Sequence, residues 1–247
     1  MNGAEAKYEN GARIVTDDGV ALGDSRTMQG LWTEAQYLRL TDGCNHPIEF
    51  TDGQLELQPM PTDRHQSILK FLFRALLFVE DIGGVVHFAA LRLRVREGKF
   101  REPDLLLLLD AQDPRRRDDY WLGADLVLEV VSPDNPVGFL DRGMRLPNEP
   151  TFAPGDRPRV VLKHRLVSDL VEKRTDYAEA NIPEYWIVNP MDETLTVLTL
   201  VDGQYVERGV FRRGQQARSG CLPDFSVAVA AVFDAGKQGP DALERNV

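Results

Sequence analysis

Two short, almost uninterrupted apolar runs constrain the fold of this chain more than any other feature. Leu105–Leu109 is a continuous leucine run that directly follows Asp104, and Asp125–Val131 (DLVLEVV) carries Glu129 among aliphatic residues. Runs of this length and character are typical of central strands that are buried on both faces of a sheet. The chain must therefore cover both faces of that sheet with helices or with a second sheet.

Helical and hairpin patterns surround these two runs. His65–Glu80 has apolar residues at helical spacing and is the clearest helix, and a second helix is expected over 169–181. Asp-Gly at 52–53 and at 202–203 separates alternating apolar segments, which predicts two β-hairpins. A helix between the strands near Val127 and Ile187 suits a crossover that joins parallel strands. We expect an α/β (α+β) fold, a mixed central sheet flanked by helices with N-terminal and C-terminal β-hairpins.

Composition excludes several classes of protein. The 247 residues are 43% hydrophobic and 28% charged, which is close to the globular average and excludes wholesale disorder. The formal net charge of −10 disfavours a nonspecific nucleic-acid coat protein, which would be basic, but leaves a nucleic-acid enzyme open. No apolar run approaches the length of a membrane-spanning helix, and we expect no membrane partner. Cys44 and Cys221 match no metal spacing and are expected to be reduced thiols in a cytoplasmic protein.

The chain is expected to form one domain with polar ends. Residues 1–26 are polar and aperiodic and predict a flexible N-terminal tail, residues 27–235 form the domain, and residues 236–247 form a C-terminal tail. Within the domain, residues 135–167 are rich in Pro and Gly and locally basic, which indicates an insertion. Two interpretations of it stay open: a tolerated surface insertion, or a basic flap that contacts a phosphate backbone.

Asp104, Glu129 and Lys173 are the candidate catalytic residues. A carboxylate in a buried strand is costly unless it meets a cation or its pKa is raised, so Glu129 predicts either a metal site or an ion pair with an arginine at a sheet edge. Lys173 shares one helix face with Asp169 and Tyr177, which fits either a surface salt bridge to Asp169 or a lysine placed over the two acids. Two carboxylates suit Mg²⁺ or Mn²⁺, and a nearby lysine stabilises the charge that develops when a phosphodiester is hydrolysed.

Several ordered motifs resemble the Uma2 family, also called DUF820, of the PD-(D/E)XK restriction-endonuclease superfamily. The resemblance covers about residues 31–233. It rests on F-T-D-G-Q-L-E (Phe50–Glu56) with the later His65, P-D (Pro103 and Asp104), E-V-V-S-P (Glu129–Pro133), D-x-x-x-K-x-x-x-Y (Asp169, Lys173 and Tyr177) and I-P-E-Y-W-I-V-N-P (Ile182–Pro190).

The resemblance implies a restriction-endonuclease-like mixed sheet and a metal-dependent DNA endonuclease. Asp104 and Glu129, with the backbone carbonyl of Val130, would hold Mg²⁺ or Mn²⁺. The usual superfamily position for the lysine is Val131 here, so the resemblance points to Lys173 on the next helix. Glu56 is implied as an additional acid in preference to Glu49, and a homodimer is implied.

Two other functions stay open on sequence grounds. The same fold can serve as a catalytically inactive module that binds nucleic acid or a protein partner, which the predicted insertion and the negative net charge favour. A hydrolase with the same metal chemistry but another phosphate or nucleotide substrate is the third hypothesis, because fold does not determine function.

Overall fold

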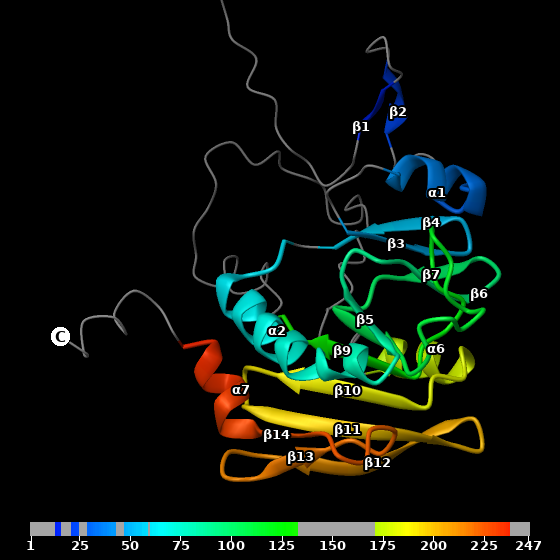
Figure 1. Cartoon of the computed structure of the whole chain (residues 1–247). Coiled ribbons are helices and arrows are strands. Elements are labelled where there is room, and N and C mark those ends of the chain that lie inside the picture. The colour runs from blue at the N-terminus through cyan, green and yellow to red at the C-terminus, as the bar shows by residue number, and fades with distance from the viewer. Residues whose placement is uncertain are drawn as a thin grey trace, which may run out of the picture.

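A six-stranded mixed sheet lies at the centre of the protein, whose structure is a computed structural model (Figure 1). It describes residues 13–15, 21–24, 29–42, 47–58, 60–132 and 171–237. The strand order is β12-β11-β10-β9-β8-β5. The only parallel neighbours in this sheet are β9 and β10, and the other pairs are antiparallel. The strands are β5 (Val85–Phe88), β8 (Leu105–Leu108), β9 (Leu126–Val130), β10 (Glu184–Asn189), β11 (Thr194–Val201) and β12 (Gln204–Phe211).

A four-stranded sheet of order β4-β3-β7-β6 lies beside the central sheet, and two smaller sheets complete the strands. It consists of β3 (Ile48–Thr51), β4 (Gln54–Leu57), β6 (Leu93–Arg96) and β7 (Lys99–Arg101). The smaller sheets pair β1 (Arg13–Val15) with β2 (Ala21–Asp24), and β13 (Gln216–Arg218) with β14 (Ser226–Ala228).

Both Asp-Gly pairs form the predicted hairpin turns. Asp52 and Gly53 have φ angles of 46° and 83°, and Asp202 and Gly203 have 49° and 76°. Consecutive positive φ angles match the right-handed twist of the flanking strands and suit Asp-Gly. The β3–β4 and β11–β12 hairpins are thereby confirmed.

Five helices are described, of which α2 and α7 cover one face of the central sheet and α6 covers the other. Their bounds are α1 (Glu34–Thr41), α2 (Asp63–Leu76), α3 (Phe78–Asp81), α6 (Lys173–Glu179) and α7 (Val229–Ala235). Thr33 caps α1 in a capping box with Gln36, and Thr62 caps α2. Residues of α2 and α7 pack with Leu105 and Leu107 on one face of β8, whereas Tyr177 of α6 packs with Leu106 and Leu108 on the other.

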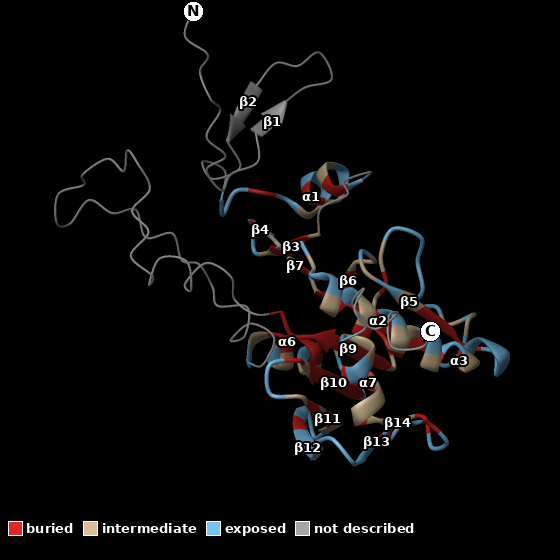
Figure 2. Ribbon diagram, turned by 90° about the vertical axis from the view of Figure 1, so that its left-hand side faces the viewer, coloured by how far each residue is buried: buried red, intermediate tan, exposed pale blue. Residues whose placement is uncertain are grey.

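The central strands are buried on both faces, as the apolar runs predict. Every residue of β8 and of β9 is buried, Glu129 included. Figure 2 shows β9 in the buried interior of the protein. A third cluster, which contains Tyr37, Phe50 and Phe100, packs α1 on the four-stranded sheet. The parallel pairing of β9 with β10 confirms the expected crossover arrangement.

The helix boundaries differ from the sequence expectation. The helix expected over 65–80 begins two residues earlier, at Asp63, because Thr62 supplies the cap, and it ends at Leu76 before the short helix α3. The helix expected over 169–181 is α6, of which residues 173–179 are α-helical and 171–172 form a wider helical turn. The predicted insertion, the Asp169 end of that helix, most of the predicted N-terminal tail and residues 238–247 lie outside the described residues.

Candidate active site

Asp104 and Glu129 lie at neighbouring ends of two antiparallel strands. Leu105 of β8 is opposite Leu128 of β9, so the residue before β8 lies beside the last residues of β9. The backbone N–H of Val130 donates to Asp104 Oδ2 at 2.8 Å, which fixes one oxygen of that carboxylate. The strand register therefore brings together two acids that are 25 residues apart in sequence.

Lys173 is buried against two glutamates, Glu129 and Glu49, rather than exposed on the surface. Only 2% of the residue is exposed, and its Nζ lies 2.9 Å from Glu129 Oε1 and 3.5 Å from Glu49 Oε1. Of the two sequence interpretations of Lys173, the geometry matches a lysine placed over the acids. β9 is a central strand, so Glu129 does not lie at a sheet edge.

Tyr177 holds the same oxygen of Glu129 from the next turn of α6. Its hydroxyl donates to Glu129 Oε1, and its ring packs edge-on against Tyr185 with centroids 5.0 Å apart. Burial, with the negative charge of Glu129 next in importance, raises the pKa of Tyr177 well above its ordinary value. The phenol therefore stays protonated and acts as a fixed donor to the carboxylate.

His65 holds Asp104 from the first turn of α2. His65 Nε2 lies 3.1 Å from Asp104 Oδ2, and only 3% of His65 is exposed. Burial alone would raise the pKa of Asp104, but the hydrogen bond and charge of His65, the charge of Lys173 and the Val130 amide together lower it. Asp104 is thus kept as a carboxylate. His65 Nδ1 is buried and has no hydrogen-bond partner within the described part of the chain.

A buried ion network joins the four-stranded sheet to α6. Arg101 of β7 contacts Glu49 Oε2 at 2.8 Å and Asp176 Oδ2 at 2.7 Å, and Lys99 also contacts Asp176. Glu49 therefore lies between two cations, Arg101 and Lys173. The network fixes the start of α6, and with it the ammonium group, relative to β3.

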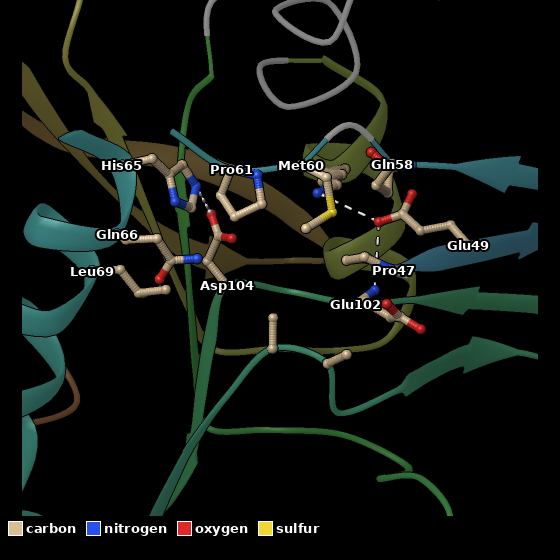
Figure 3. Close-up of a pocket in the computed structure, with 13 residues that line it drawn as sticks. Pro47, Glu49, Gln58, Met60, Pro61, His65, Gln66, Leu69, Glu102 and Asp104 are labelled. Atoms are coloured by element: carbon tan, nitrogen blue, oxygen red, sulfur yellow. Dashed lines mark hydrogen bonds and ion pairs between the residues drawn. The ribbon is translucent and has the colours of Figure 1, made fainter. Parts of the chain in front are cut away.

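A cavity of about 380 Å³ opens onto these residues (Figure 3). Figure 3 shows His65 and Asp104 on one side of it and Glu49 on the other. The cavity lies where α2, the end of the β3–β4 hairpin, the segment after β5 and the start of β8 meet. Its lining comprises Pro47, Glu49, Gln58, Met60, Pro61, His65, Gln66, Leu69, Ala89, Ala90, Glu102, Asp104 and Lys173.

The donor set is compatible with a small divalent cation. Asp104, Glu129 and the Val130 carbonyl are hard oxygen ligands of the kind that Mg²⁺ and Mn²⁺ bind, and Mg²⁺ needs only one or two carboxylates because it retains waters. Within the described residues there is no group of three or more His, Cys, Asp or Glu side chains arranged to hold a metal ion. Any cation here would therefore depend on these two carboxylates and the peptide oxygen.

The two candidate additional acids occupy different positions. Glu49 and Glu56 are directly opposite each other in the β3–β4 hairpin. Glu49 is buried and lines the cavity, whereas Glu56 is half-buried and is not among the lining residues. The sequence favoured Glu56 over Glu49, but of these two residues it is Glu49 that lines the cavity.

The sequence motifs gave no catalytic role to Arg101 or to His65. The only local signal was the charged stretch at 99–104 (KFREPD) immediately before a buried strand. Both residues act through partners that are more than 35 residues away, at separations of 39 for His65–Asp104 and 52 for Arg101–Glu49.

Within the described ranges, none of the helices is both long and apolar enough to cross a bilayer. This finding concerns helices 34–41, 63–76, 78–81, 173–179 and 229–235.

Comparison with known proteins identifies the family. The fold is similar to the crystal structure of "a putative nuclease belonging to DUF820" from Anabaena variabilis, with 14% sequence identity, a TM-score of 0.58, and coverage of 83% of this chain and 99% of that chain. The curated proteins include no match to this sequence. The sequence model of Uma2, described as "Putative restriction endonuclease", matches residues 34–138 and 161–230, and its interruption falls inside the segment predicted as an insertion. This match covers more than half of the chain, and the protein therefore belongs to the Uma2 family.

Proposed function

We propose that this protein is a metal-dependent endonuclease that hydrolyses phosphodiester bonds in DNA. The observation that carries the proposal is the buried ammonium of Lys173, which lies 2.9 Å from Glu129 at a cavity that Asp104 also lines. Family membership and the similar fold of a nuclease support the reaction class. Two acids and a lysine at one site are the minimum that phosphodiester hydrolysis with a divalent cation requires.

Each side chain has a distinct task in this proposal. Asp104, Glu129 and the Val130 carbonyl would hold Mg²⁺ or Mn²⁺, which when bound supplies Lewis-acid polarisation of the phosphodiester and makes water a better nucleophile. The Lys173 ammonium donates hydrogen bonds toward the extra negative charge of the transition state. His65 and Tyr177 hold the two carboxylates in place.

Lys173 is held in position from the opposite side. Glu49 contacts its ammonium at 3.5 Å, and Arg101 keeps Glu49 oriented from the far side. The two carboxylates offset part of the cost of burying the charge of the ammonium. We propose Glu49 as the additional acid of the site, with Glu56 as the comparison residue.

Cleavage of supercoiled plasmid DNA with Mg²⁺ or Mn²⁺ tests the proposal. The wild type is expected to nick the plasmid, whereas Asp104→Ala and Glu129→Ala are expected to lose at least a factor of about 100, in the range found when one charge-stabilising group is removed. Asp224→Ala, a change at an exposed aspartate, is the matched control and should behave as the wild type. Equal nicking by all four proteins would reject the proposal, because it would indicate a contaminating nuclease.

A catalytically inactive binding module is the second candidate. It is favoured by the contacts of one carboxylate oxygen. Lys173 and Tyr177 both contact Glu129 Oε1, so this oxygen already has partners without a metal ion. Titration calorimetry separates the two candidates. Absence of Mg²⁺ or Mn²⁺ binding at millimolar concentration, together with retained DNA binding, would support the module.

The remaining elements of the proposal concern substrate and assembly. A panel of nucleotides and phosphodiesters separates a DNA endonuclease from a hydrolase with another phosphate substrate. We also propose a homodimer, because cutting two strands requires two sites or two encounters. Sedimentation of the wild type at several concentrations tests it.

A further inference from the structure

Phe88 exposes an aromatic ring at the edge of the candidate active site. The residue is 55% exposed, although it is the last residue of a strand of the central sheet. Phe88 is opposite Leu105 in the β5–β8 register, and the N–H of the next residue, Ala89, donates to the carbonyl of Asp104 at 3.1 Å. Since Ala89 lines the cavity, the ring is one residue away from the cavity wall and close to a candidate metal ligand.

The ring of Phe88 is held in a fixed orientation by α2. It packs edge-on against Phe73, with centroids 5.0 Å apart and an interplanar angle of 83°. An edge-to-face contact is a preferred arrangement of aromatic pairs and leaves the remaining surface of the ring available. Phe88 is thus held in place while about half of the residue stays exposed, which leaves its ring free to stack on a flat partner.

Two exposed cations lie on the face of α2 that leads away from the same cavity. Gln66 lines the cavity, and Lys70 and Arg74 follow at spacings of four residues, so all three lie along one side of the helix. Each step advances by about 6 Å. Lys70 and Arg74 are exposed, and neither forms an ion pair with any acidic residue that the structure describes. The chain has a net charge of −10, so two neighbouring exposed cations without an ion pair to any described acid make this face of α2 unusually positive.

We infer that Phe88, Lys70 and Arg74 form a binding surface for an unpaired nucleotide next to the phosphodiester to be cut. The inference rests on the proposed nuclease function and specifies its substrate as a single strand or a strand with unpaired bases. Phe88 stacks on one base, while Lys70 and Arg74 contact the phosphates that lead away from the cavity. An aromatic ring combined with a cationic track is the usual means of binding single strands.

The exposed ring favours an unpaired base over a duplex. In a duplex, the faces of each base are covered by its neighbours in the stack, so a protruding ring can stack only where a base is unstacked. A second copy of the chain is the other occupant that could cover Phe88. The exposed Lys70 and Arg74 of α2, the helix against which Phe88 packs, and the cavity one residue away favour nucleic acid.

Fluorescence anisotropy with labelled oligonucleotides tests the inference on the full-length chain. The probes are a 12-nucleotide single strand, the duplex of the same sequence, and the single strand with abasic sites. All proteins carry Asp104→Asn, which under the proposed function prevents cleavage of the probe, and Ca²⁺ replaces Mg²⁺. The single strand is expected to bind more tightly than the duplex.

The variants separate stacking from charge. Phe88→Ala should weaken single-strand binding by about 5- to 100-fold, which corresponds to the loss of one stacked base, and Phe88→Trp should restore it. The abasic probe should bind the Phe88 protein and Phe88→Ala equally. Lys70→Ala/Arg74→Ala should lower the slope of log K against log salt by about 1.4. The matched controls are Val206→Ala, which changes a residue that is 54% exposed on β12, and Arg208→Ala/Arg212→Ala, and neither should alter binding.

Three results would overturn the inference. The first is unchanged affinity of Phe88→Ala for the single strand, and the second is equal affinity of the wild-type surface for single strand and duplex. The third is dissociation of a dimer by Phe88→Ala in sedimentation, which would assign the ring to an interface between copies. The binding assay requires no cleavage. Phe88-dependent binding without hydrolysis by the wild type therefore rejects only the proposed function, whereas hydrolysis without Phe88 dependence rejects only this surface.

Discussion

At the scale of single residues, the site depends on how each carboxylate oxygen is held. Glu129 Oε1 is contacted by the Lys173 ammonium and by the Tyr177 hydroxyl, and Asp104 Oδ2 is held by His65 and the Val130 amide. The carboxylates were recognisable from sequence because an acid among aliphatic residues is costly without a partner. The role of His65 was not recognisable from sequence, because its contact with Asp104 depends on how α2 packs on the sheet.

Tyr177→Phe removes one hydrogen bond to Glu129 while it keeps the ring in place. We expect the affinity for Mn²⁺ to fall by about 10- to 100-fold, as is typical when a residue that orients a metal ligand is lost. Titration calorimetry measures it, and urea unfolding shows how far stability changes. Tyr205→Phe is the control, since Tyr205 is buried in the same cluster but donates to the carbonyl of Ile182. Equal Mn²⁺ affinity of both variants would contradict a positioning role for Tyr177.

Glu49→Gln and Glu56→Gln distinguish the two acids of the β3–β4 hairpin. Glu49→Gln is expected to reduce plasmid nicking by at least 10-fold, because the Lys173 ammonium loses one of its two carboxylates. Glu56→Gln should leave nicking within a factor of two, since Glu56 does not line the cavity. The reverse ranking in the nicking assay would restore the choice that the sequence favoured.

At the scale of elements, α6 is held to the four-stranded sheet by buried charge rather than by apolar contact alone. Asp176 and Arg101 are each 2% exposed, and Arg101 bridges Asp176 and Glu49. The hydrophobic patterns predicted the central strands and α2, because a strand buried on both faces is continuously apolar and a helix buried on one face repeats every 3.6 residues. They did not predict this network, since its members come from β3, β7 and α6 and no local pattern links them.

Arg101→Met should cost about 3–5 kcal/mol of unfolding free energy, because Glu49 and Asp176 would be left buried without their shared cation. Arg96→Met is the matched variant. Its ion pairs with Asp52 and Glu179 lie at the surface and are worth about 0–1 kcal/mol. Urea unfolding curves at neutral pH measure both changes. Losses of similar size would show that the Arg101 network contributes no more than a surface pair.

The loop before β14 half-buries the thiol of Cys221. Burial, followed by the charge of Glu184, raises the pKa of Cys221 from 9.0 to about 12. Between these pH values the unfolded chain releases the proton first, so folding protects the thiol and stability falls as pH rises from 9 to 12. At pH 9, iodoacetamide should modify Cys221 several hundred-fold more slowly in the native protein than in urea. Mass spectrometry of the Cys221 peptide measures this, and equal rates would contradict the burial.

At the scale of the whole molecule, two sheets and α6 surround one cavity. Glu49 comes from the four-stranded sheet, Asp104 and Glu129 come from the central sheet, and Lys173 lies between them. The fold class was predictable because central strands, amphipathic helices and turn residues agree with one another. The packing of the second sheet against the first was not, since it is determined by side-chain contacts between segments far apart in sequence.

Mn²⁺ should raise the melting temperature of the protein beyond the effect of ionic strength. A cation that binds the native state stabilises it in proportion to the logarithm of its concentration, by about 2.7 kcal/mol at 100 times Kd. Thermal unfolding in MnCl₂ is compared with NaCl at matched ionic strength, which controls for screening of the net charge of −10. Asp104→Asn should abolish the difference. The same increase in Asp104→Asn would place Mn²⁺ elsewhere on the protein.

The ammonium of Lys173 contacts one carboxylate from each sheet, so under the proposed function its position depends on how the two sheets are spaced. A substitution at Arg101, which joins the four-stranded sheet to α6 and is not among the residues that line the cavity, would change that spacing. Turnover in such a variant would then show how strongly the proposed reaction depends on the separation of these two layers.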